Sequence, residues 1–388
     1  MQSASTVLLV RPASFAFNAE TAQSNHFQHA LTGLSAKQVQ QQAYAEFDNA
    51  VATLRERGVR VLVEEDTPAP AKPDAVFPNN WGTFHPDGRV LLYPMCAPNR
   101  RSERRPDILE RLGQQFVLTE VVDLSAHEQR GRFLEGTGSI IFDHVHRRAY
   151  ACLSARTDAA LFEEVAARLS YKPVPFHAYD AQDQSIYHTN VMLCVGAGFA
   201  VICLESITDA ADQTRVVESL TSTGHEIVAI SLGQVTQFAG NMLTVQPATG
   251  PELLVMSQSA YDALTVEQRG RLSQYCELLP LPIPTIETIG AAAPAACWPK
   301  SFCRRFPSPL SAKPASPGLL AHPRKPGPDT PARRRSRRLE WRLAPPCRGA
   351  GWGLPNRPST LKRPSGRRAG EKTWSAVRGG RSRRGAGQ

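Results

Sequence analysis

Four short polar motifs recur along the first two thirds of the chain at nearly constant spacing. Their central residues stand 55, 53 and 53 positions apart and are Asn80, Glu135, His188 and Asn241. A second amide, Asn190, lies two residues after the histidine. A carboxylate, an imidazole and several amides around one cavity suit proton transfer on a planar polar ligand. We therefore treat these residues as members of a candidate site.

Each motif taken alone has a simpler interpretation. A single histidine beside a strand is more often a structural residue than a catalytic one. The Glu135-Gly-Thr-Gly138 run suits a turn, because glycine adopts positive φ angles without a steric cost. Asn79 and Asn80 suit a turn that is capped by their own side chains. The recurrence of polar clusters at the same place in successive segments favours a shared site over four unrelated turns.

The segments around these motifs share one layout. Each motif runs into a β-rich stretch, a turn and a second apolar run, and a helical pattern and a short third strand follow in most of them. The helical patterns cover residues 105–116, 158–169 and 210–223. Such a period is typical of repeated units that share a core, so the central residues should meet at the middle of a ring. The remaining pieces are predicted as a strand at 7–11, a helix at 35–57 and a strand at 59–64.

The composition of the chain changes abruptly after Gly290. Residues 1–290 hold 22 Lys and Arg against 32 Asp and Glu, whereas residues 291–388 hold 23 against 3. The second part also carries 15 of the 31 prolines and no hydrophobic periodicity, so burial there cannot offset the entropy of ordering. We expect residues 1–290 to form the domain that bears the site and residues 291–388 to be a disordered basic tail that a protease trims. We do not interpret its charge as a signal of specific nucleic-acid binding.

The sequence contains no signal for export, a membrane span or a bound metal. Its start lacks the basic and apolar regions of a secretory signal, and nowhere do 18 apolar residues follow one another. The cysteines of residues 1–290 are scattered, which indicates reduced thiols in a cytoplasmic protein. The histidines show no zinc spacing with them, so we expect no metal and no cofactor. The oligomeric state stays open, with a homo-oligomer among the alternatives.

In order and spacing the four motifs resemble those of the amidinotransferase and deiminase superfamily, the penteins. They read VFPNNWGTFH, FLEGTGSI, YHTNVML and QFAGNMLTV. The resemblance spans residues 5–290 and is closest to citrulline-utilisation hydrolases related to arginine deiminase. It implies an α/β propeller of five ββαβ units around a pseudo-fivefold axis. It also implies a Cys–His–Glu/Asp set that attacks a ureido or guanidino carbon without a cofactor.

The resemblance assigns a role to each matching residue. His188 would be the general acid and base, and Glu135 would hold the nitrogen atoms of the substrate. Asn80 and Asn190 stand where deiminases commonly carry aspartates that bind a guanidinium. An amide carries no charge and donates as well as accepts, which favours a neutral ureido group such as that of citrulline. Two alternatives stay open: an amidinotransferase that passes the group to an amine, and an inert binding protein of the same fold.

The nucleophile is the part of the resemblance that fails. The family carries its cysteine in a segment similar to Glu-x-Ile-Gly-Gly-Gly-Ser-x-Arg-Cys, which this chain follows only to Gly290. A coding string for Gly-Gly-Gly-Ser-Ala-Arg-Cys-Met-Leu-Ala-Glu-Val-Phe-Leu, with one base deleted after its first codon, translates as residues 290–303. We interpret the tail as a frameshifted reading that truncates the fifth unit, with a genuine basic tail or a linker as alternatives. Cys297 lies one place beyond the expected cysteine and on a strand would face away from His188, which predicts an inactive chain.

Overall fold

The computed structural model of the chain describes residues 1–291 and 300–301. All of them lie in one unit, Met1–Pro314, and the second unit, Ala315–Gln388, contains none of them. The predictions for the basic tail and for Cys297 therefore lie outside the described residues. None of the helices in the described part is long and apolar enough to cross a membrane.

Most of the described chain consists of four copies of one module. In each copy two strands form an antiparallel hairpin, and a third strand returns parallel to the second after a helical connection. A parallel return needs such a crossover, and the 53–55 residues between the sequence motifs are the length of one module. The strand triplets are β3 (Gly82–Phe84), β4 (Arg89–Leu92) and β5 (Glu120–Asp123); β6 (Ile141–Asp143), β7 (Arg148–Cys152) and β8 (Lys172–Phe176); β9 (Leu193–Val195), β10 (Phe199–Ile202) and β11 (Glu226–Ala229); and β12 (Leu243–Val245), β13 (Leu253–Ser257) and β14 (Glu277–Leu281).

The helices of these modules lie where the apolar spacing predicts them. The connecting helices are α3 (Pro106–Gly113), α5 (Ala159–Arg168), α6 (Ala210–Thr221) and the pair α8 (Gln258–Ala263) and α9 (Val266–Leu272). Helices α5 and α6 begin after Asp158 and Asp209, whose carboxylates accept from backbone N–H groups of the first turn. The shorter helices are α1 (Ala19–Ala22), α4 (Gly136–Ser139), α7 (Leu232–Val235) and α10 (Pro284–Gly290).

The N-terminal elements extend the first module's sheet. Strand β1 (Thr6–Arg11) pairs parallel with β2 (Arg60–Glu65), and the capped helix α2 (Ala36–Glu56) joins the two strands. Strand β15 (Lys300–Ser301) lies between β1 and β3, antiparallel to β1 and parallel to β3. The sheet therefore reads β2-β1-β15-β3-β4-β5. Strands β15, β1 and β2 are paired in the same way as the three strands of a module. The predicted truncation of a fifth unit concerns residues 291–388, most of which lie outside the described part.

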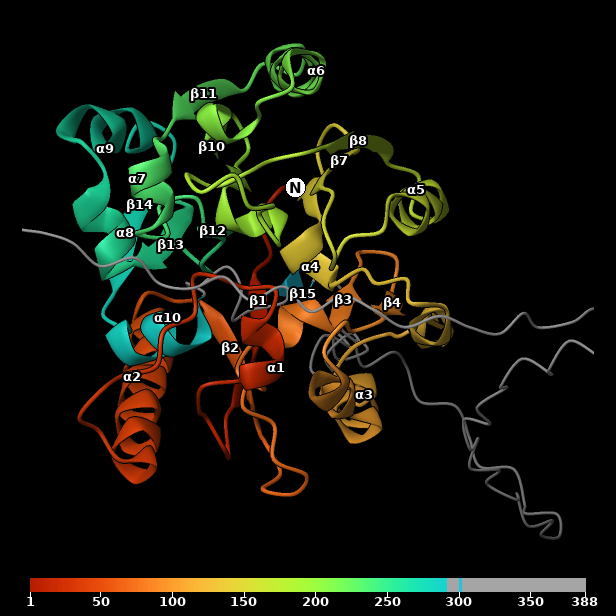
Figure 1. Cartoon of the computed structure of the whole chain (residues 1–388), viewed down its shortest axis with the longest axis vertical. Helices are drawn as coiled ribbons and strands as arrows, with labels where there is room; N and C mark the ends of the chain where they lie inside the picture. Colours follow the sequence, from red (N-terminus) through yellow and green to blue (C-terminus); the bar gives the residue numbers. More distant parts are fainter. Residues whose placement is uncertain (292–299, 302–388) are drawn as a thin grey trace, which may run out of the picture. The chain divides into compact units, whose positions relative to one another are not determined.

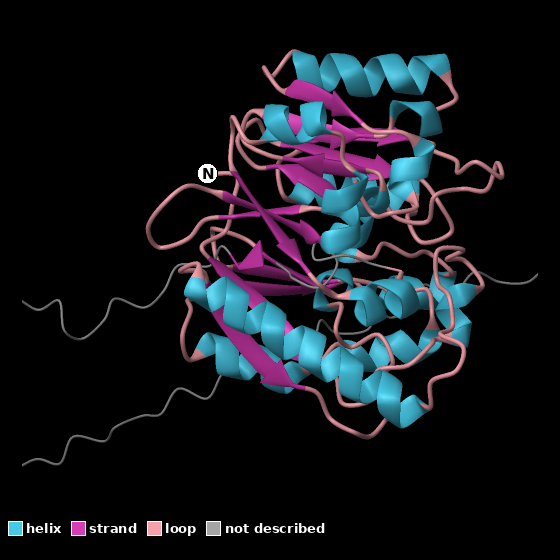
Figure 2. Ribbon diagram, turned by 90° about the vertical axis from the view of Figure 1, so that its left-hand side faces the viewer, coloured by secondary structure: helices cyan, strands magenta, loops and turns pink. Residues whose placement is uncertain are grey.

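The strands form the interior of the described unit and the helices cover them. Figure 1 shows α2, α3, α5, α6 and α9 at its periphery, with α4 near its middle. In Figure 2 the strands lie between outer helices, and the longest helix runs along one side. Strands β10 and β13 are buried at every residue, since sheet neighbours and helices surround them. This packing directs the residues that precede each hairpin toward the middle of the unit.

Candidate active site

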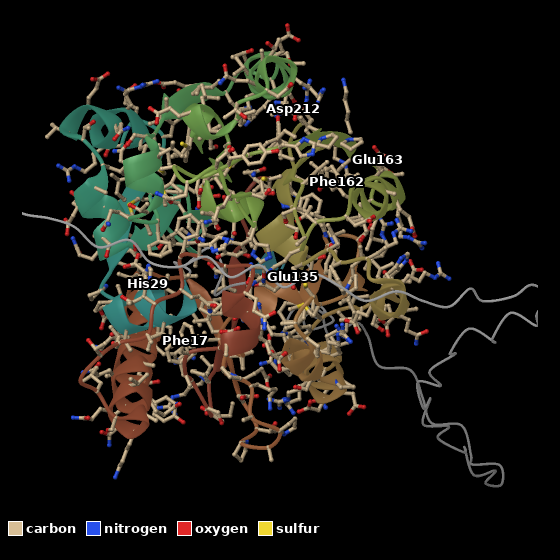
Figure 3. All side chains as sticks on the ribbon, viewed as in Figure 1. Phe17, His29, Glu135, Phe162, Glu163 and Asp212 are labelled. Atoms are coloured by element: carbon tan, nitrogen blue, oxygen red, sulfur yellow. The ribbon has the colours of Figure 1, made fainter. Side chains whose placement is uncertain are left out.

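The candidate residues lie in short helical segments that lead into the first strand of a module. Asn80 ends a 3₁₀ turn before β3, Glu135 immediately precedes α4, and His188 and Asn190 flank the start of a 3₁₀ turn before β9. All four side chains are buried. Figure 3 shows Glu135 near the middle of the unit, away from the peripheral helices.

Two glycines allow these segments to approach one another. A β-carbon on Gly138 would lie 2.7 Å from the His188 ring and 3.0 Å from the amide nitrogen of Asn80. Gly136 has a φ of +44°, and a β-carbon there would lie 2.0 Å from the carbonyl oxygen of Asn79. The Glu-Gly-Thr-Gly run is therefore a turn, as its glycines suggest, and also the place where three modules meet.

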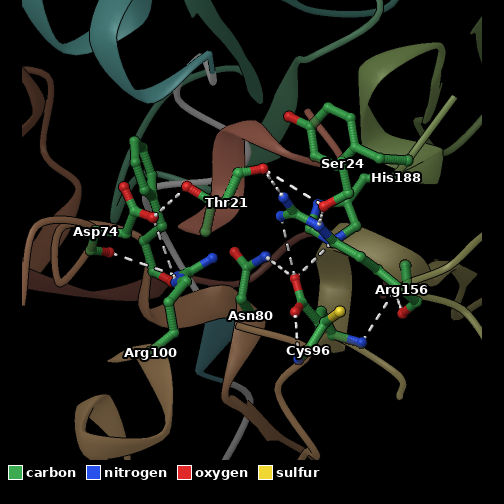
Figure 4. A network of polar contacts seen from close by, with 12 residues as sticks. Thr21, Ser24, Asp74, Asn80, Cys96, Arg100, Arg156 and His188 are labelled. Carbon is green, nitrogen blue, oxygen red and sulfur yellow. Dashed lines mark hydrogen bonds and ion pairs between the residues drawn. The ribbon is translucent and has the colours of Figure 1, made fainter. Parts of the chain in front are cut away.

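The structure brings Glu135, His188 and Asn80 together (Figure 4). His188 Nε2 lies 2.9 Å from Glu135 Oε2, and the amide nitrogen of Asn80 lies 3.5 Å from the same oxygen. The two other candidate amides are buried as well, with side chains that have no hydrogen-bond partner among the described residues; they are Asn190 and Asn241. Such groups are costly to bury without a partner, which makes an amide beside a cavity available to a ligand.

Two further groups hold the Glu135 carboxylate. Its Oε1 accepts from the backbone N–H of Cys96 at 2.9 Å, and Nη1 of Arg156 lies 3.5 Å from Oε2. Arg156 is itself fixed, because its guanidinium donates to the Thr21 carbonyl at 2.7 Å and to Ser24 Oγ at 2.9 Å. The N-terminal segment that carries Thr21 and Ser24 is thereby tied to the site.

The surroundings of Glu135 and His188 shift the pKa values of the two side chains. Burial by itself would raise the pKa of Glu135, but Arg156 and then His188 outweigh burial and bring that pKa below its ordinary value. Burial lowers the pKa of His188 to about 4, against the opposing effect of Glu135. The pair is therefore an ionised carboxylate and a neutral imidazole at neutral pH. Because Nε2 faces the carboxylate, it carries the proton, and Nδ1 is the basic nitrogen.

A second buried ion cluster lies beside the first. Arg100 forms a bidentate contact with Glu103, at 2.9 Å through Nε and 2.9 Å through Nη2, and its Nε lies 3.7 Å from Asp74. The sequence analysis identified neither this cluster nor Arg156, since these residues occupy no repeated position. The sequence contains one indication of the Arg100 cluster, because Asp74 lies six residues before Asn80 in the first motif region.

These groups surround a small cavity. Asn80, His188 and Asn190 contribute to its wall, and Glu135 is bonded to two of these three residues. Asn241, which the repeat predicts at the same place, is absent from the described lining. The full lining is Thr21, Asn25, Gln28, Asp74, Phe77, Asn80, Arg100, Arg156, Tyr187, His188, Asn190 and Gly290.

The nucleophile predicted from the resemblance is not among the described residues, because Cys297 lies in the segment 292–299. Helix α10 brings the chain to the cavity wall at Gly290, and the Tyr187 hydroxyl donates to the carbonyl of Ala291 at 2.9 Å. Cys96 is the thiol nearest in the contacts of Glu135, but burial raises the pKa of that thiol. A raised pKa leaves a thiol unreactive at neutral pH.

Comparisons with known proteins identify the family and the fold of this chain. A family model described as "N,N dimethylarginine dimethylhydrolase, eukaryotic" matches residues 11–297. The substrate-bound N-terminal domain of ArgZ, an arginine dihydrolase of Cyanobacteria, is 19% identical with a TM-score of 0.58, over 77% of this chain and 98% of that one. AgrE with ornithine and NAD⁺ is 17% identical with a TM-score of 0.59, over 79% and 40%. A dimethylarginine dimethylaminohydrolase adduct is 13% identical with a TM-score of 0.51, over 79% and 100%. No curated protein sequence matches.

Proposed function

Because the chain belongs to the N,N-dimethylarginine dimethylhydrolase family of the pentein superfamily, we propose that its fold serves a hydrolase of guanidino or ureido amino acids. The reaction would break the C–N bond of the terminal planar group. The observation that carries this proposal is the buried pair of an ionised Glu135 and a neutral His188 beside an unpaired amide, Asn190. We further propose that β15, β1, α2 and β2 are the fifth unit of a ring.

The mechanism uses a cysteine in the segment that follows Gly290. Neutral His188 takes the proton of the thiol, and the thiolate attacks the planar carbon of the substrate. Glu135 holds the substrate nitrogens and balances the positive charge, while Asn190 donates and accepts at the same group. The imidazolium of His188 then protonates the departing amine. His188 next deprotonates a water molecule, which hydrolyses the thiol-linked intermediate and frees the cysteine.

The charges of the cavity point to an amino acid as substrate. Asp74 lies at the cavity wall and has one carboxylate oxygen without a hydrogen-bond partner among the described residues. That oxygen suits an ammonium group. At the reacting end the ionised Glu135 suits a guanidinium, whereas the amides suit a ureido group. The assay should therefore compare dimethylarginine, arginine and citrulline.

We propose that the chain as written lacks this activity. Residues 1–290 would carry the site, and residues 291–388 would be a frameshifted tail in place of the nucleophile segment. One argument supports this: a single base deletion in a coding string for the family's cysteine segment reproduces residues 290–303. The structure of the cavity up to Gly290 favours a second function for this chain, binding of the same ligands without turnover.

Resequencing the gene across codons 288–300 and restoring one base tests both proposals. The restored protein should release an amine or ammonia from one of the three substrates, and replacing the restored cysteine by alanine should abolish release. Glu135→Gln in the restored protein should lower kcat. Full activity of the chain as written, lost in Cys297→Ala, would show that the frameshift account is wrong. No turnover by a folded restored protein would contradict the hydrolase assignment.

A further inference from the structure

A cluster of three side chains of metal-binding types lies away from the catalytic pair. Asp143 ends β6, His146 lies in the turn that follows, and His225 directly precedes β11. One ligand atom of each residue lies within 4.8 Å of those of the other two. No spacing along the chain predicts this cluster, since 79 positions separate the two histidines. Glu135 precedes α4 and β6, whereas Asp143 closes β6, so the cluster and the catalytic carboxylate lie at opposite ends of that strand.

The carboxylate of Asp143 is buried and its ion-pair partners in the described part of the chain are histidines. The Asp143 side chain is 1% exposed, His225 is 0% exposed, and His146 is 32% exposed. Within residues 1–291, no lysine or arginine forms an ion pair with Asp143. Buried carboxylates are generally paired with a permanent cation or coordinate a metal.

The distances in the cluster match the edges of a tetrahedral site. Asp143 Oδ2 lies 2.9 Å from His146 Nδ1 and 3.9 Å from His225 Nε2. Zinc bonds of about 2.0–2.2 Å to nitrogen and oxygen give tetrahedron edges of roughly 3.3–3.6 Å. The two distances lie on either side of that range, and a rotation of the partly exposed His146 ring would lengthen the shorter one. The exposed side of His146 leaves room for water as a fourth ligand.

Hydrogen bonds hold the His225 ring at both nitrogen atoms. Nε2 donates to the Gly196 carbonyl at 3.2 Å and faces Asp143 Oδ2 at 3.9 Å, while Thr223 Oγ1 lies 2.8 Å from Nδ1. A metal ion at Nε2 would replace the proton on that nitrogen. The ring would then carry its proton on Nδ1 and donate it to Thr223 Oγ1. A second hydrogen bond that fixes the tautomer is the usual support of a metal-bound histidine.

We propose that Asp143, His146 and His225 bind one divalent transition-metal ion of the zinc type. His146 and Asp143 come from the β6–β7 hairpin, and His225 packs against the β9–β10 turn through Gly196. The ion joins the module that follows Glu135 to the module that follows His188. Its role is to fix the two modules relative to each other, and the proposal is independent of the hydrolase assignment. It runs against the expectation of no metal, which rested on cysteine spacing.

The test is metal binding by the full-length chain after removal of metals with a chelator. We compare the wild type with His146→Gln, His225→Gln and the matched control His177→Gln, whose ring contacts Asp212 at 3.1 Å without a second histidine. Co²⁺ is the probe, because nitrogen and oxygen ligands give visible bands, whereas thiolate ligands add a strong ultraviolet band. Wild type and control should bind one Co²⁺ through nitrogen and oxygen. Both cluster variants should bind at least about tenfold more weakly.

A second readout separates binding from folding. Zn²⁺ should raise the Tm of the wild type and of His177→Gln, because a ligand that binds the folded state stabilises it. It should not raise the Tm of His146→Gln, which alters a partly exposed side chain and keeps the buried residues. Equal Co²⁺ binding by all four proteins would overturn the proposal. The same conclusion follows if Zn²⁺ leaves the Tm of the folded wild type unchanged, in which case the cluster holds a proton and no metal.

Discussion

The Glu135 carboxylate is fully buried and depends on its neighbours to remain ionised. It receives a backbone N–H from Cys96, contacts His188 at 2.9 Å and faces the Arg156 guanidinium at 3.5 Å. Of these three contacts, Arg156 supplies the full positive charge, because His188 is neutral at neutral pH. The contribution of Arg156 to folding is therefore mainly the compensation of one buried charge.

Replacing Arg156 by alanine should lower the free energy of unfolding by about 3–5 kcal/mol, since Glu135 would then be a buried charge without a cation. The double variant with Glu135→Gln should lose less than the two single variants together, because the charge that needed compensation is absent. Urea unfolding measures all three proteins. Arg168→Ala, which breaks an exposed pair with Glu164 on α5, is the control and should change little. Additive losses would contradict the assigned role.

Asn190 and Asn241 allow stability and ligand binding to be separated. Both side chains are buried without a hydrogen-bond partner among the described residues, but only Asn190 belongs to the described cavity lining. Leucine at either position removes an unpaired amide, so Asn190→Leu and Asn241→Leu should leave the Tm unchanged or raise it. A guanidino or ureido amino acid that raises the Tm of the wild type should still do so in Asn241→Leu and should fail in Asn190→Leu. Loss of the response in both variants would place the ligand elsewhere.

At the level of elements, α4 is the contact point of three modules, and Gly138 makes the contact possible. Gly138→Ala should destabilise the fold by about 1–3 kcal/mol, because the new methyl group would overlap the His188 ring. Gly270 in α9 is the matched control: nothing lies within 4 Å of a β-carbon there, and alanine should stabilise by up to about 1 kcal/mol. Thermal unfolding of both variants measures the difference. Equal effects would mean that α4 packs less closely than described.

The elements themselves are largely predictable from the sequence, because their signals are local. The helix predicted at 35–57 is α2, which covers Ala36–Glu56. The pattern at 105–116 ends earlier, as α3 at Gly113, because the chain turns to bury Phe116 in the core. The position of β15 between β1 and β3 was not predictable, since strand pairing between the two ends of a chain leaves no local pattern.

The candidate site likewise contains some residues that the sequence predicts and others that it does not. The repeat period identified Asn80, Glu135 and His188 as candidate site residues, because equivalent strands of repeated modules begin at equivalent places. Arg156 and the Asp143 cluster depend on which loops meet in space, and no spacing along the chain records that. The partners of Arg156 lie between 21 and 135 residues away, as in the contacts Arg156–Glu135 and Arg156–Thr21. Long-range polar pairs of this kind are visible only in three dimensions.

At the level of the whole molecule, the site exists only while the modules are assembled. Asn80, Glu135 and His188 precede the first strands of three different modules, and Arg156 ties the N-terminal segment to them through Thr21. Any opening between these modules separates Glu135 from His188. Stability and the integrity of the site are therefore linked, and conditions that weaken the buried pair should weaken the fold as a unit.

Lowering the pH should reduce the free energy of unfolding through the buried histidines before the carboxylates become protonated. Burial lowers the pKa of His188 and of His85 from 6.5 to about 4, so below pH 6.5 the unfolded chain binds protons that the folded chain does not. Stability is then full above pH 6.5 and falls toward pH 4, by about 1.4 kcal/mol per pH unit at most for each histidine. Urea unfolding between pH 7.5 and 4.5 should show this slope, reduced in His188→Gln and in His85→Gln. His177 is exposed, so His177→Gln should keep the slope of the wild type. An unchanged slope in His188→Gln would mean that His188 is already protonated in the folded protein.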